Sequence, residues 1–205
     1  MSLFFVTGGA RSGKSRYAER LAGRLAGGSR PVLYVATAEP LDGEMRERVL
    51  RHRQRRPEDW RTVEARRSVG AALRDALAGD RSRAVVLLDC LSLLVSNVLL
   101  DVAGELGELS ESGPELERRA GREVVLEVEA LLGATAGTDL VVVSNEVGWS
   151  VVPPYRLGRV YRDLLGEANA QVAARSEAAC LLVAGLPVVL RGGDEVTGDC
   201  GTDGA

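Results

Sequence analysis

Lysine and histidine are almost absent from this chain, and both scarcities are informative. Of the 26 lysine and arginine residues only Lys14 is a lysine, and His52 is the single histidine. Cysteine is also scarce: Cys90, Cys180 and Cys200 lie far apart and form no C-x-x-C pair. One histidine and three dispersed cysteines do not match the ligand spacing of a structural zinc site. The pattern instead predicts free, buried thiols in a reducing compartment, which points to the cytoplasm.

Long apolar runs and a surplus of positive charge are missing as well. No stretch of about 18 apolar residues occurs, so the sequence contains no candidate membrane span. Residues 1–6 carry no basic side chain, which is typical of a core strand rather than of a signal peptide. The formal net charge of −3 argues against a general nucleic-acid binder.

What the sequence does contain is a regular alternation of short apolar runs with amphipathic stretches. Such alternation predicts an α/β fold, in which a mainly parallel sheet carries helices on both faces. We expect one nucleotide-binding domain over residues 1–191, with an acidic surface loop at 101–115 and a disordered tail at 192–205. The expected strands cover residues 3–7, 31–37, 84–89, 139–144, 179–184 and 188–191, and the expected helices cover 15–25, 42–56, 68–78, 91–100, 116–132 and 154–176.

The first expected strand runs directly into a phosphate-binding pattern. The glycines of such a P-loop let backbone N–H groups converge on phosphate oxygens, and the following helix offers its positive N-terminal end. Lys14 supplies a compact ammonium that a planar guanidinium would replace poorly, and Ser15 can ligate Mg²⁺. Because the pattern follows an apolar strand and opens a helix, we interpret it as a nucleotide site rather than a chance match. The residues that fit G-x-x-x-x-G-K-[ST] are Gly8, Gly9, Ala10, Arg11, Ser12, Gly13, Lys14 and Ser15.

Polar residues follow other expected strands at the same edge of the sheet, where ligands of open α/β sheets bind. Asp89 ends an apolar run and is typical of a second Mg²⁺ anchor, with a helix N-cap as the alternative. Asn145 and Glu146 follow the next strand and could position a substrate or simply form a turn. Arg156 and Arg159 lie three apart on the last long helix, where they could bind an anionic substrate or face solvent.

His52 lies in the most arginine-rich part of the chain, on the apolar stripe of the helix expected at 42–56. Clustered guanidinium groups disfavour the imidazolium ion, which leaves a neutral imidazole able to attack phosphorus. The same arginines can bind a triphosphate. From the residues alone, a surface histidine on a solvated helix is the bland alternative. An RNA-binding patch is a weaker one, because only Trp60 offers a stacking aromatic ring.

Several stretches together resemble one family. They are VTGGARSGKS, H-R-x-x-R-P-x-x-W-R-T-x-E from His52 to Glu64, LLDCLSLLVSN, N-E-V-G from Asn145, and YRLGRVYRDLLGEAN, in this order. Over residues 3–191 the chain is similar to the bifunctional adenosylcobinamide kinase / adenosylcobinamide-phosphate guanylyltransferases of cobalamin biosynthesis. The P-loop alone is unspecific, whereas the stretch that begins at His52 and the N-E-V-G stretch are far more specific.

The resemblance implies a P-loop NTPase fold of the RecA-like type, a corrinoid substrate and a homo-oligomer, since known members form trimers. It implies phosphorylation of a hydroxyl of adenosylcobinamide with ATP or GTP. It also implies transfer of GMP from GTP to that phosphate through a guanylyl-histidine, which gives adenosylcobinamide-GDP and pyrophosphate. His52 occupies the place of that histidine. The nucleotide contacts that carry over are Gly8–Ser15 together with Ala36, Thr37, Ala38, Arg53, Gln54, Arg55, Arg56, Glu64 and Asp89.

The sequence departs from the family pattern at two positions and leaves several questions open. Asp89 stands where some members have Glu, and Ala170 stands where Gln is expected after Asn169. The number of nucleotide sites, the preferred phosphoryl donor and the kinase general base, Glu146 or Asp89, stay open. Two other functions compete: a kinase for a different small molecule in which His52 is structural, and a nucleotide-dependent regulatory module.

Overall fold

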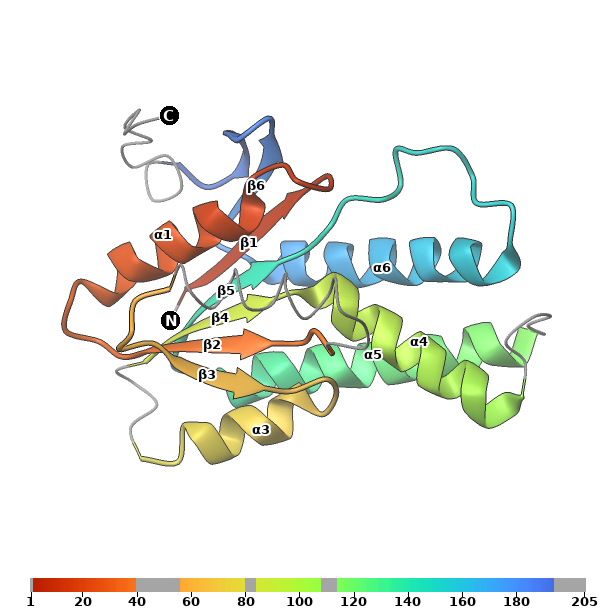
Figure 1. Cartoon of the computed structure of the whole chain (residues 1–205), viewed down its shortest axis with the longest axis horizontal. Helices are drawn as coiled ribbons and strands as arrows, with labels where there is room; N and C mark the ends of the chain where they lie inside the picture. Colours follow the sequence, from red (N-terminus) through yellow and green to blue (C-terminus); the bar gives the residue numbers. More distant parts are fainter. Residues whose placement is uncertain (1, 40–55, 80–83, 108–113, 194–205) are drawn as a thin grey trace.

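The computed structural model describes residues 2–39, 56–79, 84–107 and 114–193. Most of the helix expected at 42–56, with His52 on it, and most of the expected tail therefore lie outside the described residues. The described strands form one sheet in the order β3-β2-β4-β5-β1-β6-β7 (Figure 1). The strands are β1 (Leu3–Gly8), β2 (Val32–Ala36), β3 (Arg61–Glu64), β4 (Val85–Asp89), β5 (Asp139–Val143), β6 (Ala178–Val183) and β7 (Leu186–Arg191). The helices are α1 (Lys14–Ala26), α3 (Val69–Ala76), α4 (Leu91–Leu106), α5 (Pro114–Ala134) and α6 (Arg156–Arg175).

The sheet is mainly parallel and is covered on both faces, which confirms the predicted fold class. β1 pairs in parallel with β5 and β6, β2 with β3 and β4, and β4 with β5, whereas β7 runs antiparallel to β6. One face packs against α1 and the other against α3, α4, α5 and α6 (Figure 1). The P-loop follows β1 and opens α1, as in the P-loop NTPases of RecA-like type that the resemblance implies.

Each central strand contributes side chains to both cores. In β1, Phe4 and Val6 pack with α1, whereas Leu3 and Phe5 pack with the helices of the opposite face. Successive side chains of a strand point to opposite faces, so a strand that is covered on both faces is apolar throughout. This is why the central strands stand out as continuous apolar runs in the sequence.

β3 lies outside every strand that the sequence predicts. Its residues, Arg61 to Glu64, are exposed or half-buried, and it pairs with β2 at the edge of the sheet. An edge strand with solvent beside it needs no continuous apolar run, and charged side chains there discourage pairing with another chain. The strand therefore leaves no hydrophobic signal in the sequence.

The prediction of a surface loop at 101–115 is wrong for residues 101–106. α4 continues through this region to Leu106, and Val102 and Ala103 are fully buried. The acidic composition is misleading because Asp101 is held by Arg66 rather than by water. Arg66 donates from Nη1 and Nη2 to the two carboxylate oxygens of Asp101, over 2.6 and 2.5 Å.

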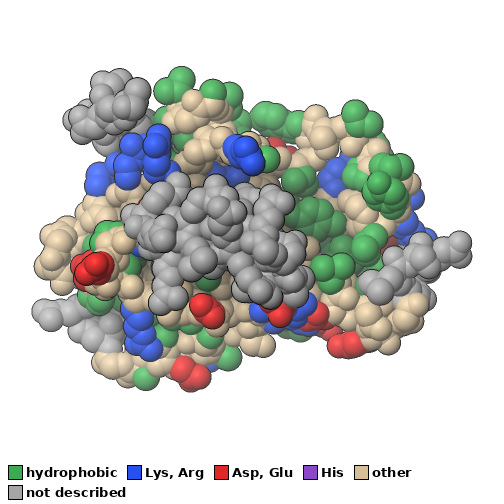
Figure 2. Space-filling view, viewed as in Figure 1, with side chains coloured by type: hydrophobic (Ala, Val, Ile, Leu, Met, Phe, Trp, Pro, Cys, Tyr) green, Lys and Arg blue, Asp and Glu red, His purple; other side chains and the backbone are tan. Residues whose placement is uncertain are grey.

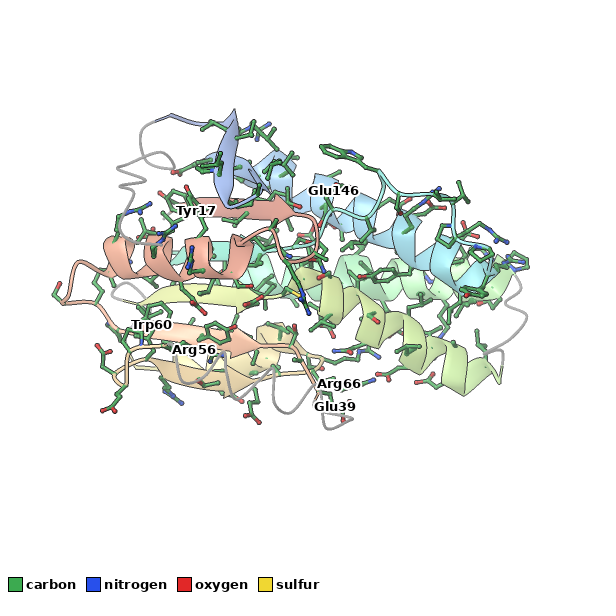
Figure 3. All side chains as sticks on the ribbon, turned by 45° about the horizontal axis from the view of Figure 1, so that its top comes forward. Tyr17, Glu39, Arg56, Trp60, Arg66 and Glu146 are labelled. Carbon is green, nitrogen blue, oxygen red and sulfur yellow. The ribbon has the colours of Figure 1, made fainter. Side chains whose placement is uncertain are left out.

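Asp101 belongs to an ion-pair network that ties the segment after β3 to α4 and α5. Arg66 also binds Glu39, with Nε 2.7 Å from Oε2, and Figure 3 shows these two side chains side by side. Arg67 donates to Glu123 of α5 over 2.5 Å. The hydrogen bonds from Arg66 are the main cause that lowers the pKa of Asp101. The network therefore fixes Glu39, the last described residue before position 40.

α3 and α5 approach each other so closely that a glycine is required between them. A Cβ atom at Gly70 would lie 2.5 Å from the carbonyl oxygen of Ala130. Glu127 of α5 is buried and accepts hydrogen bonds from the N–H groups of Ser68 and Val69, over 2.7 and 3.3 Å. A carboxylate at this helix N-terminus satisfies free N–H groups and matches the helix dipole.

Two further expectations concern membranes and thiols. Among the described residues, no helix is both long enough and apolar enough to cross a membrane. Cys90 and Cys180 are buried, as expected, and Cys200 lies outside the described residues.

Replacing Gly70 with alanine tests the close packing of α3 on α5. Alanine favours a helix by about 1 kcal/mol over glycine, but its Cβ would force the Ala130 carbonyl away. We expect Gly70→Ala to lower the free energy of unfolding by about 1–3 kcal/mol, measured by urea titration. Gly166→Ala is the matched control, because nothing lies within 4 Å of a Cβ at Gly166 in α6. Equal stability of the two variants would contradict the packing.

Replacing Asp101 with asparagine tests the ion-pair network. A carboxyl whose pKa is lowered by folding adds stability above its unfolded pKa of about 3.9, and this is lost as pH falls through the folded value. We expect Asp101→Asn to cost about 1 kcal/mol at pH 7, a low figure because water screens the partly exposed pair. The difference should shrink as the pH falls from 5 towards 3. Glu58→Gln, at an exposed position, is the control. A cost that is independent of pH would contradict the charge pairing.

Candidate active site

The P-loop connects β1 to α1 with its lysine over the loop. Gly13 has φ +90°, a left-handed conformation that glycine adopts without strain, and α1 begins at the next residue. The first N–H groups of α1 lack partners within the helix, which makes this end a ready anion site. The Lys14 ammonium donates to the carbonyl oxygen of Gly9 over 3.0 Å. The sequence pattern has therefore folded into the predicted strand, loop and helix.

Neighbouring segments hold the P-loop from two sides. The N–H of Glu146 donates to the carbonyl oxygen of Gly8, and the N–H of Gly185 donates to that of Ser12, both over 3.0 Å. A Cβ at Gly8 would lie 2.6 Å from Ser12 Oγ and 2.7 Å from the carbonyl oxygen of Leu182. Only glycine fits such a close approach, so Gly8 is needed to pack the loop against β6.

Asp89 lies at the end of β4, where a buried tyrosine orients it. The Tyr34 hydroxyl donates to Asp89 Oδ2 over 2.7 Å. Burial, together with the negative charge of Asp89, raises the pKa of Tyr34, so the phenol stays protonated and acts as a donor. The Arg56 guanidinium stacks on the Tyr34 ring, 3.3 Å from its centroid. Arg56, the first described residue after the segment that holds His52, is thus linked through Tyr34 to Asp89.

Thr37 joins the ends of β2 and β4. Its hydroxyl donates to the carbonyl oxygen of Cys90 and accepts from the Cys90 N–H, each over 2.8 Å. The Asn97 side chain in α4 donates to the carbonyl oxygens of Thr37 and Arg66, each over 3.0 Å. Asn97 is not among the predicted site residues. The sequence offers one indication of its role, an amide side chain within a mostly apolar helix.

Cys90 is a structural thiol in this site. Burial, aided by the charge of Asp89, raises its pKa to about 11, so the thiol is protonated at neutral pH and is not a nucleophile. Its Sγ lies 2.9 Å from Ser92 Oγ, which also accepts from the Asn145 amide over 3.0 Å. The thiol therefore belongs to a polar network that connects β4 to the residues after β5.

Glu146 lies beside the P-loop, as the strand-end argument predicts (Figure 3), and Asn145 precedes it directly in the chain. The Asn169 side chain in α6 holds this turn: it accepts from Ser144 Oγ over 2.6 Å and donates to the carbonyl oxygen of Asn145 over 3.0 Å. Glu146 Oε1 accepts from the Gly148 N–H over 2.7 Å. The carboxylate is half-buried, so it is available to a ligand at the loop.

The other expected nucleotide residues are spread along the same sheet edge. Ala36 is paired in register with Asp89 on one side and with Glu64 on the other. Glu64 is exposed at the end of β3, with β2, β4 and β5 between it and the P-loop strand. Ala38 is half-buried beyond the end of β2. Arg53, Gln54 and Arg55 lie outside the described residues.

Arg156 and Arg159 do not lie beside the P-loop, and their binding of an anionic substrate stays a prediction. They are at the N-terminal end of α6, which Figure 1 shows well away from the turn between β1 and α1. Arg159 Nη1 donates to the carbonyl oxygens of Pro153 and Pro154, over 3.1 and 2.8 Å. Its charge is used to fasten the preceding loop.

The oxygen ligands expected for Mg²⁺ fit its chemistry. Ser15 opens α1 and Asp89 ends β4, two elements that pack together, and Mg²⁺ prefers hydroxyl, carboxylate and phosphate oxygens. Within the described part of the chain, no three His, Cys, Asp or Glu side chains gather closely enough to hold a metal alone. A magnesium ion here would complete its octahedron with nucleotide phosphates and water.

Comparisons with known proteins agree with this geometry. Residues 4–190 match the family described as cobinamide kinase / cobinamide phosphate guanyltransferase. The bifunctional adenosylcobalamin biosynthesis protein CobU of Escherichia coli K12 is 39% identical, over 92% of this chain and 99% of that protein. CobU of Salmonella typhimurium is 37% identical over 92% and 99%. CobP of Pseudomonas aeruginosa is 41% identical over 91% and 96%.

Among solved structures, the flagellar accessory protein FlaH of Methanocaldococcus jannaschii superposes with a TM-score of 0.43 and 15% identity, over 95% of this chain and 80% of that one. That similarity is too low to support an assignment. The family match spans the P-loop, Asp89 and Asn145-Glu146, and the three relatives each cover more than nine tenths of the chain. The chain belongs to the cobinamide kinase / cobinamide phosphate guanyltransferase family.

Proposed function

We propose that this chain phosphorylates a hydroxyl group of adenosylcobinamide with ATP or GTP. It then transfers GMP from GTP to the new phosphate, giving adenosylcobinamide-GDP and pyrophosphate. One observation carries the proposal: in a member of this family, the only lysine sits in a P-loop that lies against Glu146 at the ligand-binding edge of the sheet. The relatives are named for bifunctional roles in adenosylcobalamin biosynthesis, which fits both reactions.

In the kinase reaction the P-loop holds the phosphates and a carboxylate takes the proton. The loop N–H groups and Lys14 bind the β- and γ-phosphates. Bound Mg²⁺, held by Ser15 and Asp89, would neutralise charge on the phosphates. The acceptor hydroxyl oxygen forms a bond to the γ-phosphorus while the bond to the β-phosphate oxygen breaks. Glu146 is favoured as the base for the hydroxyl proton, because Asp89 already accepts from Tyr34 and serves the metal.

In the guanylyltransferase reaction His52 is the nucleophile. Its imidazole nitrogen forms a bond to the α-phosphorus of GTP, and the bond to the β-phosphate oxygen breaks to release pyrophosphate. A phosphate oxygen of the corrinoid then displaces the histidine and restores free imidazole. Lys14 and the arginines that follow His52 stabilise the developing pyrophosphate charge. The link from Arg56 through Tyr34 to Asp89 supports the proposal, because it ties the end of the His52 segment to this site.

We also propose that the chain works in the cytoplasm as a homo-oligomer, a trimer by analogy with known members of the family. Sedimentation velocity of the purified protein measures the oligomeric state directly.

Replacing His52 with asparagine separates the two reactions. With Mg²⁺ and GTP labelled at the α-phosphate, we expect wild-type protein to retain an acid-labile, base-stable label. His52→Asn should retain none and lose GMP transfer by at least about 10³-fold, with kinase activity kept within a few-fold. GTP labelled at the γ-phosphate is the control, because that phosphate leaves with pyrophosphate. Full GMP transfer by His52→Asn would exclude a guanylyl-histidine intermediate at this position.

Replacing Glu146 with glutamine tests the proposed kinase base. Glutamine keeps an oxygen that can accept from the Gly148 N–H but cannot take up a proton. We expect kcat for phosphorylation to fall by about 10²–10⁴-fold, while labelling by GTP continues because it needs no corrinoid hydroxyl. Glu167→Gln, on the exposed face of α6, serves as the matched control. Unchanged kinase turnover in Glu146→Gln would exclude Glu146 and leave Asp89.

A further inference from the structure

Two uncharged segments carry exposed apolar side chains, and we call them the apolar rim. The first follows Glu146 beside the P-loop and runs from there to the start of α6, and the second contains Gly185, which bonds to the P-loop. One segment is the loop Val147–Tyr155, and the other is the turn Val183–Leu186 between β6 and β7. Figure 2 shows hydrophobic side chains gathered over both regions, along the upper edge of the molecule. Their exposures are 79% for Trp149, 91% for Val151, 55% for Val152, 74% for Tyr155, 50% for Val183 and 70% for Leu186.

This surface is unusual for the chain in which it occurs. Charged residues make up 27% of the sequence, yet neither segment contains one. Single exposed apolar residues are ordinary, but apolar side chains grouped beside a ligand site mark a binding surface. A buried indole ring contributes a large apolar area to binding, and Trp149, 79% exposed in the single chain, offers that area to a ligand or partner.

Hydrogen bonds tie both segments to the P-loop. Glu146 directly precedes the loop Val147–Tyr155, and its backbone N–H donates to the carbonyl oxygen of Gly8. Gly185 lies within the turn between β6 and β7, and its backbone N–H donates to the carbonyl oxygen of Ser12. The loop Val147–Tyr155 is also held near its C-terminal end, where Arg159 donates to the carbonyl oxygens of Pro153 and Pro154. With both ends fixed, Val147–Tyr155 forms a preorganised platform, which lowers the entropy cost of binding.

The chemistry of the rim does not suit a nucleotide triphosphate. The P-loop and Lys14 already serve the phosphates, and the charged triphosphate finds no hydrogen-bonding or charged partner on an uncharged apolar surface. The acceptor has the complementary chemistry, since a corrin is a broad, flat macrocycle with apolar faces and uncharged amide arms. Its reacting hydroxyl must reach the γ-phosphate while the ring is held nearby.

We propose that the apolar rim binds the corrin macrocycle of the acceptor, with Trp149 as its main contact, and so holds the reacting hydroxyl over the P-loop. The proposal rests on the proposed function, because it assigns the second substrate of that site to a surface. Arg159 becomes a positioning residue, which acts on the substrate through the loop that it fastens.

Equilibrium dialysis of cobinamide, followed by its visible absorbance, tests the proposal with the intact protein. We expect Trp149→Ala to weaken cobinamide binding by about 10- to 100-fold, as for loss of an aromatic anchor, and to raise KM for cobinamide more than it lowers kcat. Val151→Ser, at a 91% exposed position where folding is not at risk, should weaken binding less. Leu126→Ala is the matched control, because Leu126 is 67% exposed on α5, outside the rim.

Each outcome decides the proposal. Loss of cobinamide binding in the Trp149 and Val151 variants, with GTP labelling retained as a sign of correct folding, supports it. Wild-type affinity in both variants overturns it and leaves the proposed function standing. If wild-type protein itself fails to bind cobinamide, the proposed function fails and the rim proposal fails with it. A changed sedimentation coefficient in Trp149→Ala, with binding intact, would show that the rim is instead a contact between copies of the chain.

Discussion

The nucleotide site depends on the close approach of the P-loop backbone to β6 and to the turn after β5. The loop must present several N–H groups to phosphate at once, so its own carbonyl groups have to be held in fixed directions. Backbone donors from Glu146 and Gly185 do this at Gly8 and Ser12. The approach leaves no room for a side chain at Gly8. Phosphate binding is therefore a property of three chain segments, although the pattern that announces it is local.

Buried polar side chains extend this arrangement across the sheet edge. Backbone pairing stops at the carboxyl ends of β2, β4 and β5. Beyond these ends, side-chain hydrogen bonds of Thr37, Ser92, Asn97 and Asn169 connect the segments that follow the strands. A buried polar group without a partner costs about 1–3 kcal/mol, so such a network holds one arrangement against alternatives. The positions of Asp89, Asn145 and Glu146 are consequently set by buried polar side chains on neighbouring elements.

The two sides of the site differ in chemistry as their two proposed ligands differ. Lys14, the helix N-terminus and the arginines near Arg56 suit a nucleotide, whereas the apolar rim suits a broad macrocycle with apolar faces. Two arginines outside the site, Arg66 and Arg67, make ion pairs with Asp101 and Glu123. Through these pairs the segment after β3 contacts α4, α5 and Glu39, so the helical layer is connected to the edge of the sheet where β2 ends.

The sequence by itself determined the central strands, the P-loop and the place of Asp89 and Glu146 at one edge, because these depend on local apolar runs and short fixed spacings. It did not predict β3, whose edge position needs no apolar run, and it placed a loop where α4 continues, because Asp101 is paired with an arginine far away in sequence. Only the tertiary structure decided that Arg159 serves a loop and that Trp149 is exposed in the loop after Glu146. Partners distant in the chain settle such matters, and no local spacing encodes them.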